Sequence, residues 1–73
     1  MGVRLNPIRL RRELAVRGLH SADLARLADL SAATVSTAMQ GRSVSARTLR
    51  KIIFALAQVE ILPGTEELLD LAA

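Results

Sequence analysis

The chain has 73 residues, of which 51% are hydrophobic, and carries ten Lys and Arg residues against seven Asp and Glu residues. That length allows one small domain, residues 1–73, with a compact core. The sequence contains no cysteine and a single histidine, which excludes a disulfide framework and a thiolate metal site. We therefore expect no metal and no cofactor.

The charges are unevenly distributed along the chain. Residues 1–51 hold all ten basic residues and three acidic ones, a balance of +7, whereas residues 52–73 hold four acidic residues and no basic one, a balance of −4. Nine of the ten cations are arginine, which suits bidentate contacts to phosphate. The basic part indicates a polyanionic partner and the acidic, leucine-rich end indicates a protein contact. The alternative is a solvated surface with no partner.

Nothing in the sequence indicates a membrane. Arginines interrupt the first residues, which therefore lack the continuous apolar segment of a signal peptide. No apolar run approaches the ~20 residues that a spanning helix needs. We expect a cytoplasmic protein.

The sequence predicts an all-α fold, because no segment alternates at period two for long enough to form a strand. The first helix is expected over residues 7–17. Asn6 is a suitable N-cap, Pro7 suits the first helical position, and Gly18 ends the helix.

The second helix is expected over residues 21–28, with His20 or Ser21 as its N-cap. Asp23 lies in the first turn, where the helix dipole favours an anion. Ala25 is small and would let another helix pack closely.

The third helix is expected over residues 31–39, with Ser31 as its N-cap and Gly41 at its end. Asp29 stands in the short connection before it, where a left-handed backbone is tolerated better by aspartate than by most residues. The inward-facing residues, at helical spacing, are Val35, Ala38 and Met39.

A fourth helix is expected over residues 45–58 with Ser45 as N-cap, and its apolar face comprises Leu49, Ile52, Ile53 and Leu56. Pro63-Gly64 breaks the chain. A short fifth helix is expected over residues 65–72, capped by Thr65, with Leu68, Leu69 and Leu71 as its apolar residues.

The second and third helices and their short turn have the form of a helix-turn-helix, whose second helix lies in the DNA major groove. From about residue 8 to residue 72 the chain resembles the Cro/phage-repressor (XRE) family, on the segment LRRELAVRGLHSADLARLADLSAATVSTAMQGRSVSARTLRKIIFALA. The resemblance implies a compact five-helix, lambda-repressor-like domain. The stretch TVSTAMQGRSVSARTLRKI also looks like the lac-repressor family, but that family opens directly with its helix-turn-helix, and here a well-capped helix precedes the motif.

The resemblance also implies which residues meet DNA. The residues expected to contact bases are Ala32, Ala33, Ser36 and Thr37. Those expected to contact phosphates are Ser21, Ser31, Thr34, Arg42 and Arg47. Ser31 has the alternative role of a cap alone, and Arg47 that of a solvated side chain.

Two features depart from the family pattern. The third helix has no Arg, Lys, Gln or Asn before Gln40, so the side chains that make bidentate contacts to guanine and adenine are missing. Alanine and threonine can touch a thymine methyl and hydroxyls can bond either base type, so we expect modest direct readout, with DNA shape and phosphate contacts carrying more of the affinity.

The second departure is Phe54, at a position that the family usually leaves polar. Either the last helix covers Phe54, or Phe54 forms a dimer interface with Leu68, Leu69 and Leu71.

The sequence therefore predicts a sequence-specific regulator of transcription that binds double-stranded DNA, repressor-like and homodimeric. The alternative is a protein-interaction module or antitoxin-type protein that docks a partner through the acidic C-terminal helix. We expect no enzyme, because the sequence offers no Ser/His/Asp arrangement around His20, no paired carboxylates and no glycine-rich phosphate loop.

Overall fold

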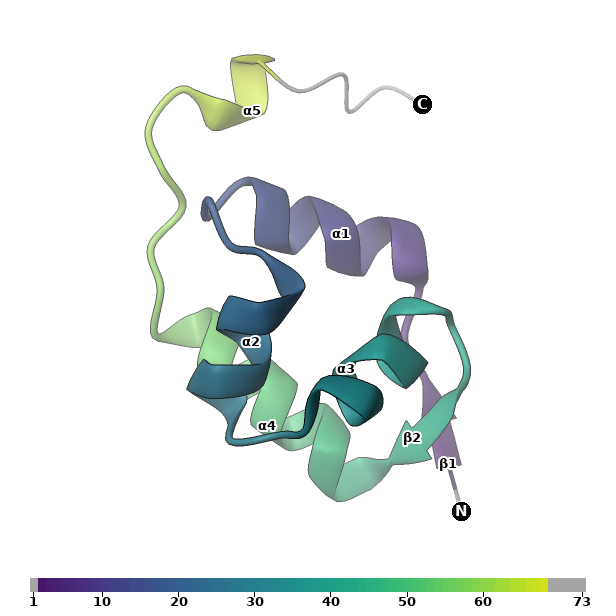
Figure 1. The fold of residues 1–73 in the computed structure, drawn as a ribbon. Coiled ribbons are helices and arrows are strands. Elements are labelled where there is room, and N and C mark those ends of the chain that lie inside the picture. The colour runs from purple at the N-terminus through teal and green to yellow at the C-terminus, as the bar shows by residue number, and fades with distance from the viewer. Residues whose placement is uncertain (1, 69–73) are drawn as a thin grey trace.

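The computed structural model describes residues 2–68, in which four helices of eight or more residues surround one core and a two-stranded sheet lies beside them (Figure 1). In chain order the elements are β1 (Gly2–Arg4), α1 (Pro7–Ala15), α2 (Ser21–Ala28), α3 (Ala32–Met39), β2 (Ser43–Ser45), α4 (Ala46–Ala57) and α5 (Thr65–Leu68). The first four helices begin and end within two residues of the bounds expected from the sequence.

The core is built from one apolar stripe of each long helix and one side chain of β2. The buried side chains in it are Leu10, Leu14, Leu24, Ala28, Val35, Ala38, Val44, Ile52 and Ala55. Leu24 is fully buried and lies on α2, which packs against both α3 and α4. Burying one such leucine or isoleucine stabilises the fold by roughly 1.5–3 kcal/mol. The positions of α2 and α3 are therefore determined by the same core that holds the domain together.

Short polar side chains set where the helices begin. The Oδ1 atom of Asn6 accepts hydrogen bonds from the backbone N–H groups of Ile8 (3.0 Å) and Arg9 (3.1 Å) at the start of α1. The Oγ atom of Ser45 accepts one from the N–H of Thr48 (3.0 Å) at the start of α4. Each cap satisfies N–H groups that a helix leaves without a backbone partner.

The start of α2 is capped from within the helix. His20 is the N-cap residue, and its backbone N–H donates to Oδ2 of Asp23 at 2.8 Å. Arg26 donates to Oδ1 of the same carboxylate at 3.1 Å. The bond from the His20 backbone and then the bond from Arg26 hold the pKa of Asp23 below its ordinary value of 3.8.

A lowered pKa of Asp23 predicts a specific loss of stability in acid. The folded state favours the ionised carboxylate of Asp23. The contribution of this carboxylate to the free energy of unfolding is therefore fully present above pH 3.8 and is lost as the pH falls through the lower folded-state pKa. We expect Asp23→Asn to be less stable than the parent at about pH 6, and the difference to shrink as the pH approaches about 2.5. Urea denaturation at the two pH values measures this, and a difference that grows in acid would contradict it.

The prediction of an all-α fold is wrong at one place. β1 and β2 pair antiparallel, with Val3 opposite Val44 and Gly2 opposite Ser45. Each strand has three residues, which is too short for alternation to be recognised, and the two strands are about forty residues apart in sequence. The small sheet adds the buried side chain of Val44 to the core.

The expected fifth helix differs as well. Within the described residues it is the single turn α5, and residues 69–72 of the expected helix lie outside that part of the chain. The segment leading to α5 is held against the end of α1, because the N–H of Leu62 donates to the carbonyl oxygen of Val16 (2.8 Å). The hydroxyl of Thr65 donates to the same oxygen (3.1 Å). Within residues 2–68 there are therefore four helices of eight or more residues and one single turn, where the sequence predicted five helices over the chain.

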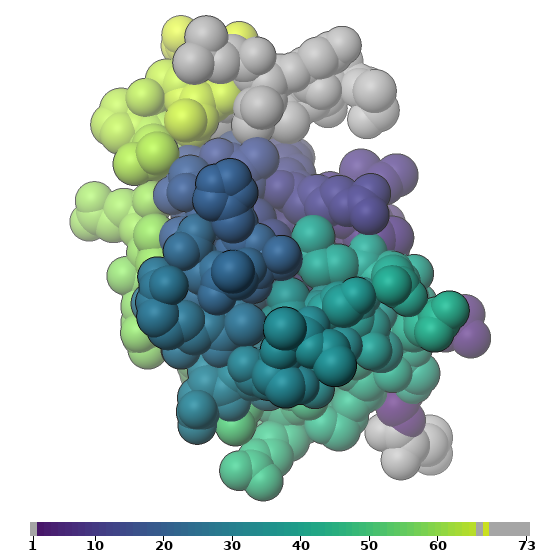
Figure 2. Space-filling model, in the orientation of Figure 1, coloured from purple at the N-terminus to yellow at the C-terminus, as the bar shows by residue number. Residues whose placement is uncertain are grey.

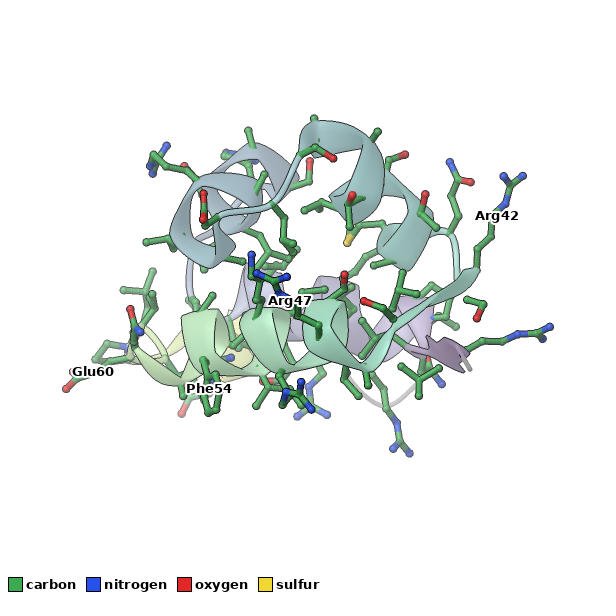
Figure 3. The ribbon with its side chains drawn as sticks, turned by 90° about the horizontal axis from the view of Figure 1, so that it is seen from below. Arg42, Arg47, Phe54 and Glu60 are labelled. Atoms are coloured by element: carbon green, nitrogen blue, oxygen red, sulfur yellow. The ribbon has the colours of Figure 1, made fainter. Side chains whose placement is uncertain are left out.

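Part of the apolar face expected for α4 is exposed. Ile52 and Ala55 are buried, whereas Ile53 is 50% exposed and Phe54 63% exposed. Residues 69–72 of the helix expected to cover Phe54 lie outside the described residues, so that expectation stays a prediction. Figure 3 shows Phe54 projecting from the side of α4 that faces away from α2 and α3. Its expected dimer partners, Leu69, Leu71 and the side chain of Leu68, lie outside the described residues.

Candidate nucleic-acid interface

The connection between α2 and α3 is tight and uses a left-handed residue. Asp29, directly after α2, has φ 54° and ψ 52°, as its type and position suggested. The N–H of Leu30 donates to the carbonyl oxygen of Ala25 (2.9 Å), which closes the end of α2. Three residues are therefore enough to turn the chain from α2 into α3.

A lysine of α4 forms a hydrogen bond with this turn. Nζ of Lys51 donates to the carbonyl oxygen of Asp29 at 3.2 Å. The two residues are 22 positions apart, so no local sequence signal identifies the pair. The bond fixes the entry point of α3 relative to α4.

The start of α3 is a capped helix end. Oγ of Ser31 accepts from the N–H of Thr34 (3.1 Å), and the two hydroxyls lie 2.8 Å apart in a second hydrogen bond. Ser31 is therefore a cap, and one hydroxyl hydrogen of the pair remains available. A helix N-terminus also presents free N–H groups that suit a phosphate.

One face of α3 points away from the core. Ala32, Ala33 and Ser36 are exposed, and Thr37 is half-buried, whereas Val35 on the opposite face is buried. Positions 32, 33, 36 and 37 share one side of a helix, since residues three and four apart are neighbours. Figure 2 shows α3 at the front of the molecule, beside α2, on the face turned toward the viewer. The four residues expected to contact bases thus lie on one accessible side.

Two arginines lie near α3. Arg42 and Arg47 are both exposed. In Figure 3 Arg42 extends outward beyond the C-terminal end of α3, and Arg47 extends from the start of α4 along the side turned toward α2 and α3. Gly41, with φ 73°, turns the chain between α3 and Arg42. The arrangement puts positive charge beside the exposed face of α3.

A surface hollow of about 230 Å³ lies between the start of α2 and α3. Its lining residues are Ser21, Ala22, Ala32, Val35, Ser36 and Met39. Ser21, expected to contact phosphate, is therefore next to the residues expected to contact bases. Ala22 and Met39 were not among the expected contacts, because neither carries a polar group that marks a binding residue.

Arg17 does not belong to this positive surface. Its Nε donates to the carbonyl oxygens of Leu56 (3.0 Å) and Val59 (2.9 Å), and its Nη1 lies 2.7 Å from Oε1 of Glu13. The side chain is 13% exposed. This arginine joins the ends of α1 and α4, so Arg17, like Lys51, has a structural role.

Within residues 2–68, no three His, Asp or Glu side chains come together as metal ligands do. No helix in the same range has the length and apolar character of a membrane span. The one constellation of accessible residues that the sequence singled out and the fold brings together is the outer side of α3 with its flanking arginines.

Comparison with known proteins agrees with this geometry. A family model described as a Cro/C1-type HTH DNA-binding domain matches residues 9–57, which include α2, the turn, α3 and α4. No curated protein and no solved structure matches the chain significantly.

Proposed function

Since the chain belongs to the family of Cro/C1-type helix-turn-helix DNA-binding domains, we propose that it is a sequence-specific regulator of transcription with α3 in the major groove of double-stranded DNA. The observation that carries the proposal is the exposed side of α3, with Ala32, Ala33 and Ser36 free of the core. Small side chains there let the helix backbone approach the base edges closely. The first helix of such a motif, here α2, crosses the DNA backbone.

The groups that would meet the phosphates surround that side. Arg42 and Arg47 are exposed and carry guanidinium groups suited to bidentate contacts with phosphate. Ser21 lies at the start of α2, and the Ser31–Thr34 pair retains one hydroxyl hydrogen for an acceptor. Phosphate contacts of this kind fix orientation on the duplex and carry no sequence information themselves.

The phosphate contacts predict how binding responds to salt. Each Arg–phosphate contact releases counterions, so log K falls with log salt by about 0.9 per contact. We expect Arg42→Gln and Arg47→Gln each to weaken binding and to reduce that slope by about 1, measured by fluorescence anisotropy between about 50 and 200 mM salt. The matched control is Arg12→Gln, because Arg12 is exposed on α1 and lines neither the hollow beside α3 nor the groove that contains Ile53. An equal change in slope for Arg12→Gln would contradict this assignment.

We further propose that the protein binds as a repressor-like homodimer through the apolar α4 surface, defined by Ile53 and Phe54. Both side chains are half-exposed or more, and exposed apolar patches on small domains mark interaction sites. A two-fold dimer would place two α3 helices about one helical turn apart, ~34 Å, on a near-palindromic site.

Sedimentation of the full chain tests the dimer. The parent protein is expected to sediment as a dimer and Phe54→Ser as a monomer with unchanged helical content, because Phe54 lies outside the core. Phe54→Ser should also bind a full palindromic site more weakly than the parent. A parent protein that stays monomeric at concentrations saturating its DNA would contradict the dimer.

Selection of bound duplexes from a random pool tests DNA binding itself. We expect enrichment of one sequence motif and a gel shift with genomic fragments at low salt. Absence of any shift at low salt would contradict the proposal and favour a protein-interaction role through the acidic C-terminal segment.

A further inference from the structure

The exposed side of α3 presents methyl groups in place of free hydrogen-bond donors. Ala32 and Ala33 are exposed and end in methyl groups. The hydroxyl of Thr37 donates to the carbonyl oxygen of Ala33 at 3.0 Å, so its hydrogen is used inside the helix. The methyl group of Thr37 takes no part in this bond.

The remaining polar groups of α3 are mostly engaged as well. The hydroxyl groups of Ser31 and Thr34 bond one another at the N-terminal end of the helix, which leaves one hydroxyl hydrogen of the pair undonated. Nε2 of Gln40 donates to Oγ of Ser36 at 3.2 Å. The structure describes the whole of α3. In the middle of its exposed side, the hydroxyl hydrogen of Ser36 is the one that is not donated to another group.

The hollow beside α3 extends this apolar character. Four of its six lining residues, Ala22, Ala32, Val35 and Met39, are apolar. The hollow is open to the surface between α2 and α3 and has a volume of about 230 Å³. A phosphate needs donors and could use only the serine side of the hollow, where Ser21 lies, whereas the four apolar residues suit an apolar group.

In the major groove only thymine offers an apolar group, the methyl on C5; the other base edges offer donors and acceptors. A helix side made of methyl groups gains nothing from the O6 and N7 acceptors of guanine and leaves them without partners. It gains from burying a thymine methyl, because both surfaces leave water.

Resting on the proposed function, which supplies the location of the site, we propose that this protein recognises its operator through thymine 5-methyl groups packed against Ala32, Ala33 and the hollow between α2 and α3. The single free hydroxyl of Ser36 adds one polar contact. The ligand is thus a duplex whose half-sites place thymines opposite the first two turns of α3.

Removal of single methyl groups from the DNA tests the proposal. In the duplex enriched by selection, each thymine is replaced in turn by deoxyuridine, which lacks only the 5-methyl group. We expect at least one thymine in each half-site to lose about 4-fold in affinity, the value for burying one methyl-sized group. In a second duplex, the responding thymine is replaced by cytosine, with guanine opposite it. Methylating that cytosine at C5 should then raise the affinity by about the same factor.

Substitutions in the protein locate the contact. Ala33→Ser and Ala32→Ser each replace one hydrogen of the exposed methyl group by a polar hydroxyl, so the thymine-to-deoxyuridine effect at the facing position should fall below about 2-fold. Ala15→Ser is the matched control, because Ala15 is exposed on α1, and it should retain the full effect. Circular dichroism of each variant checks that the helices are intact.

The outcomes separate this inference from the proposed function. If no duplex is enriched and no low-salt binding occurs, the proposed function fails. If a duplex is enriched but no thymine responds to deoxyuridine, DNA binding stands and the methyl recognition is overturned. Equal responses in the parent, Ala32→Ser and Ala33→Ser would likewise overturn it.

Discussion

Ala33→Glu is expected to weaken binding to the selected duplex by at least about 100-fold, or ~2.7 kcal/mol, while the domain stays folded. Ala33 is exposed near the start of α3, so a longer side chain displaces nothing in the core. Glutamate is a good helix former, and near a helix N-terminus its charge is favourable. In the major groove the same carboxylate would meet the negative field of two phosphate backbones, and like charges brought together cost several kcal/mol.

The matched control for this prediction is Ala15→Glu. It makes the same change in net charge at an exposed position on α1. We expect it to weaken binding by no more than about 3-fold, through the longer-range effect of net charge alone. Anisotropy titrations at one salt concentration, with thermal melts of both variants, measure the difference. If the two variants lost affinity equally, α3 would not be the element in the groove.

Ile52→Ala is expected to lower the free energy of unfolding by about 2–5 kcal/mol. Ile52 is 1% exposed and lies where α4 meets the other helices, so its removal leaves a cavity as well as losing buried apolar area. Domains of this size have total stabilities near the low end of about 5–15 kcal/mol. The variant should therefore be partly unfolded at room temperature, and its DNA binding should fall with the folded fraction.

Ile53→Ala is the control, because it is the same substitution at the neighbouring residue, which is 50% exposed. We expect a loss below about 1 kcal/mol in urea denaturation at low protein concentration. If the proposed dimer uses Ile53, the loss should grow as protein concentration rises, since association stabilises the folded state. Equal losses for the two variants at low concentration would show that the core does not lie on the Ile52 side of α4.

The candidate site was accessible to sequence reasoning because it is built from local features. Ser31 caps α3, Asp29 turns the chain in the left-handed region, and the spacing of residues 32, 33, 36 and 37 puts them on one side. Each of these depends on residues within four positions of one another. The hollow beside α3 was not accessible, because it depends on how closely α2 approaches α3.

The same division applies to the basic residues. Their number and their concentration in residues 1–51 are properties of the sequence. Their roles are not, since Arg17 and Lys51 turn out to hold helices and a turn by bonds to distant carbonyl groups. A basic composition therefore overestimates the charge available to DNA.

The sequence by itself determined the first four helices, their caps and the outward side of α3, because hydrogen bonds and side-chain spacing within one or two helical turns are sufficient to specify them. Only the tertiary structure decided that β1 pairs with β2, and that Ile52 is buried where Ile53 and Phe54 are exposed. These outcomes depend on contacts between segments up to about forty residues apart. A helix with a broad apolar stripe can bury any part of it, and the neighbouring helices select which part leaves water.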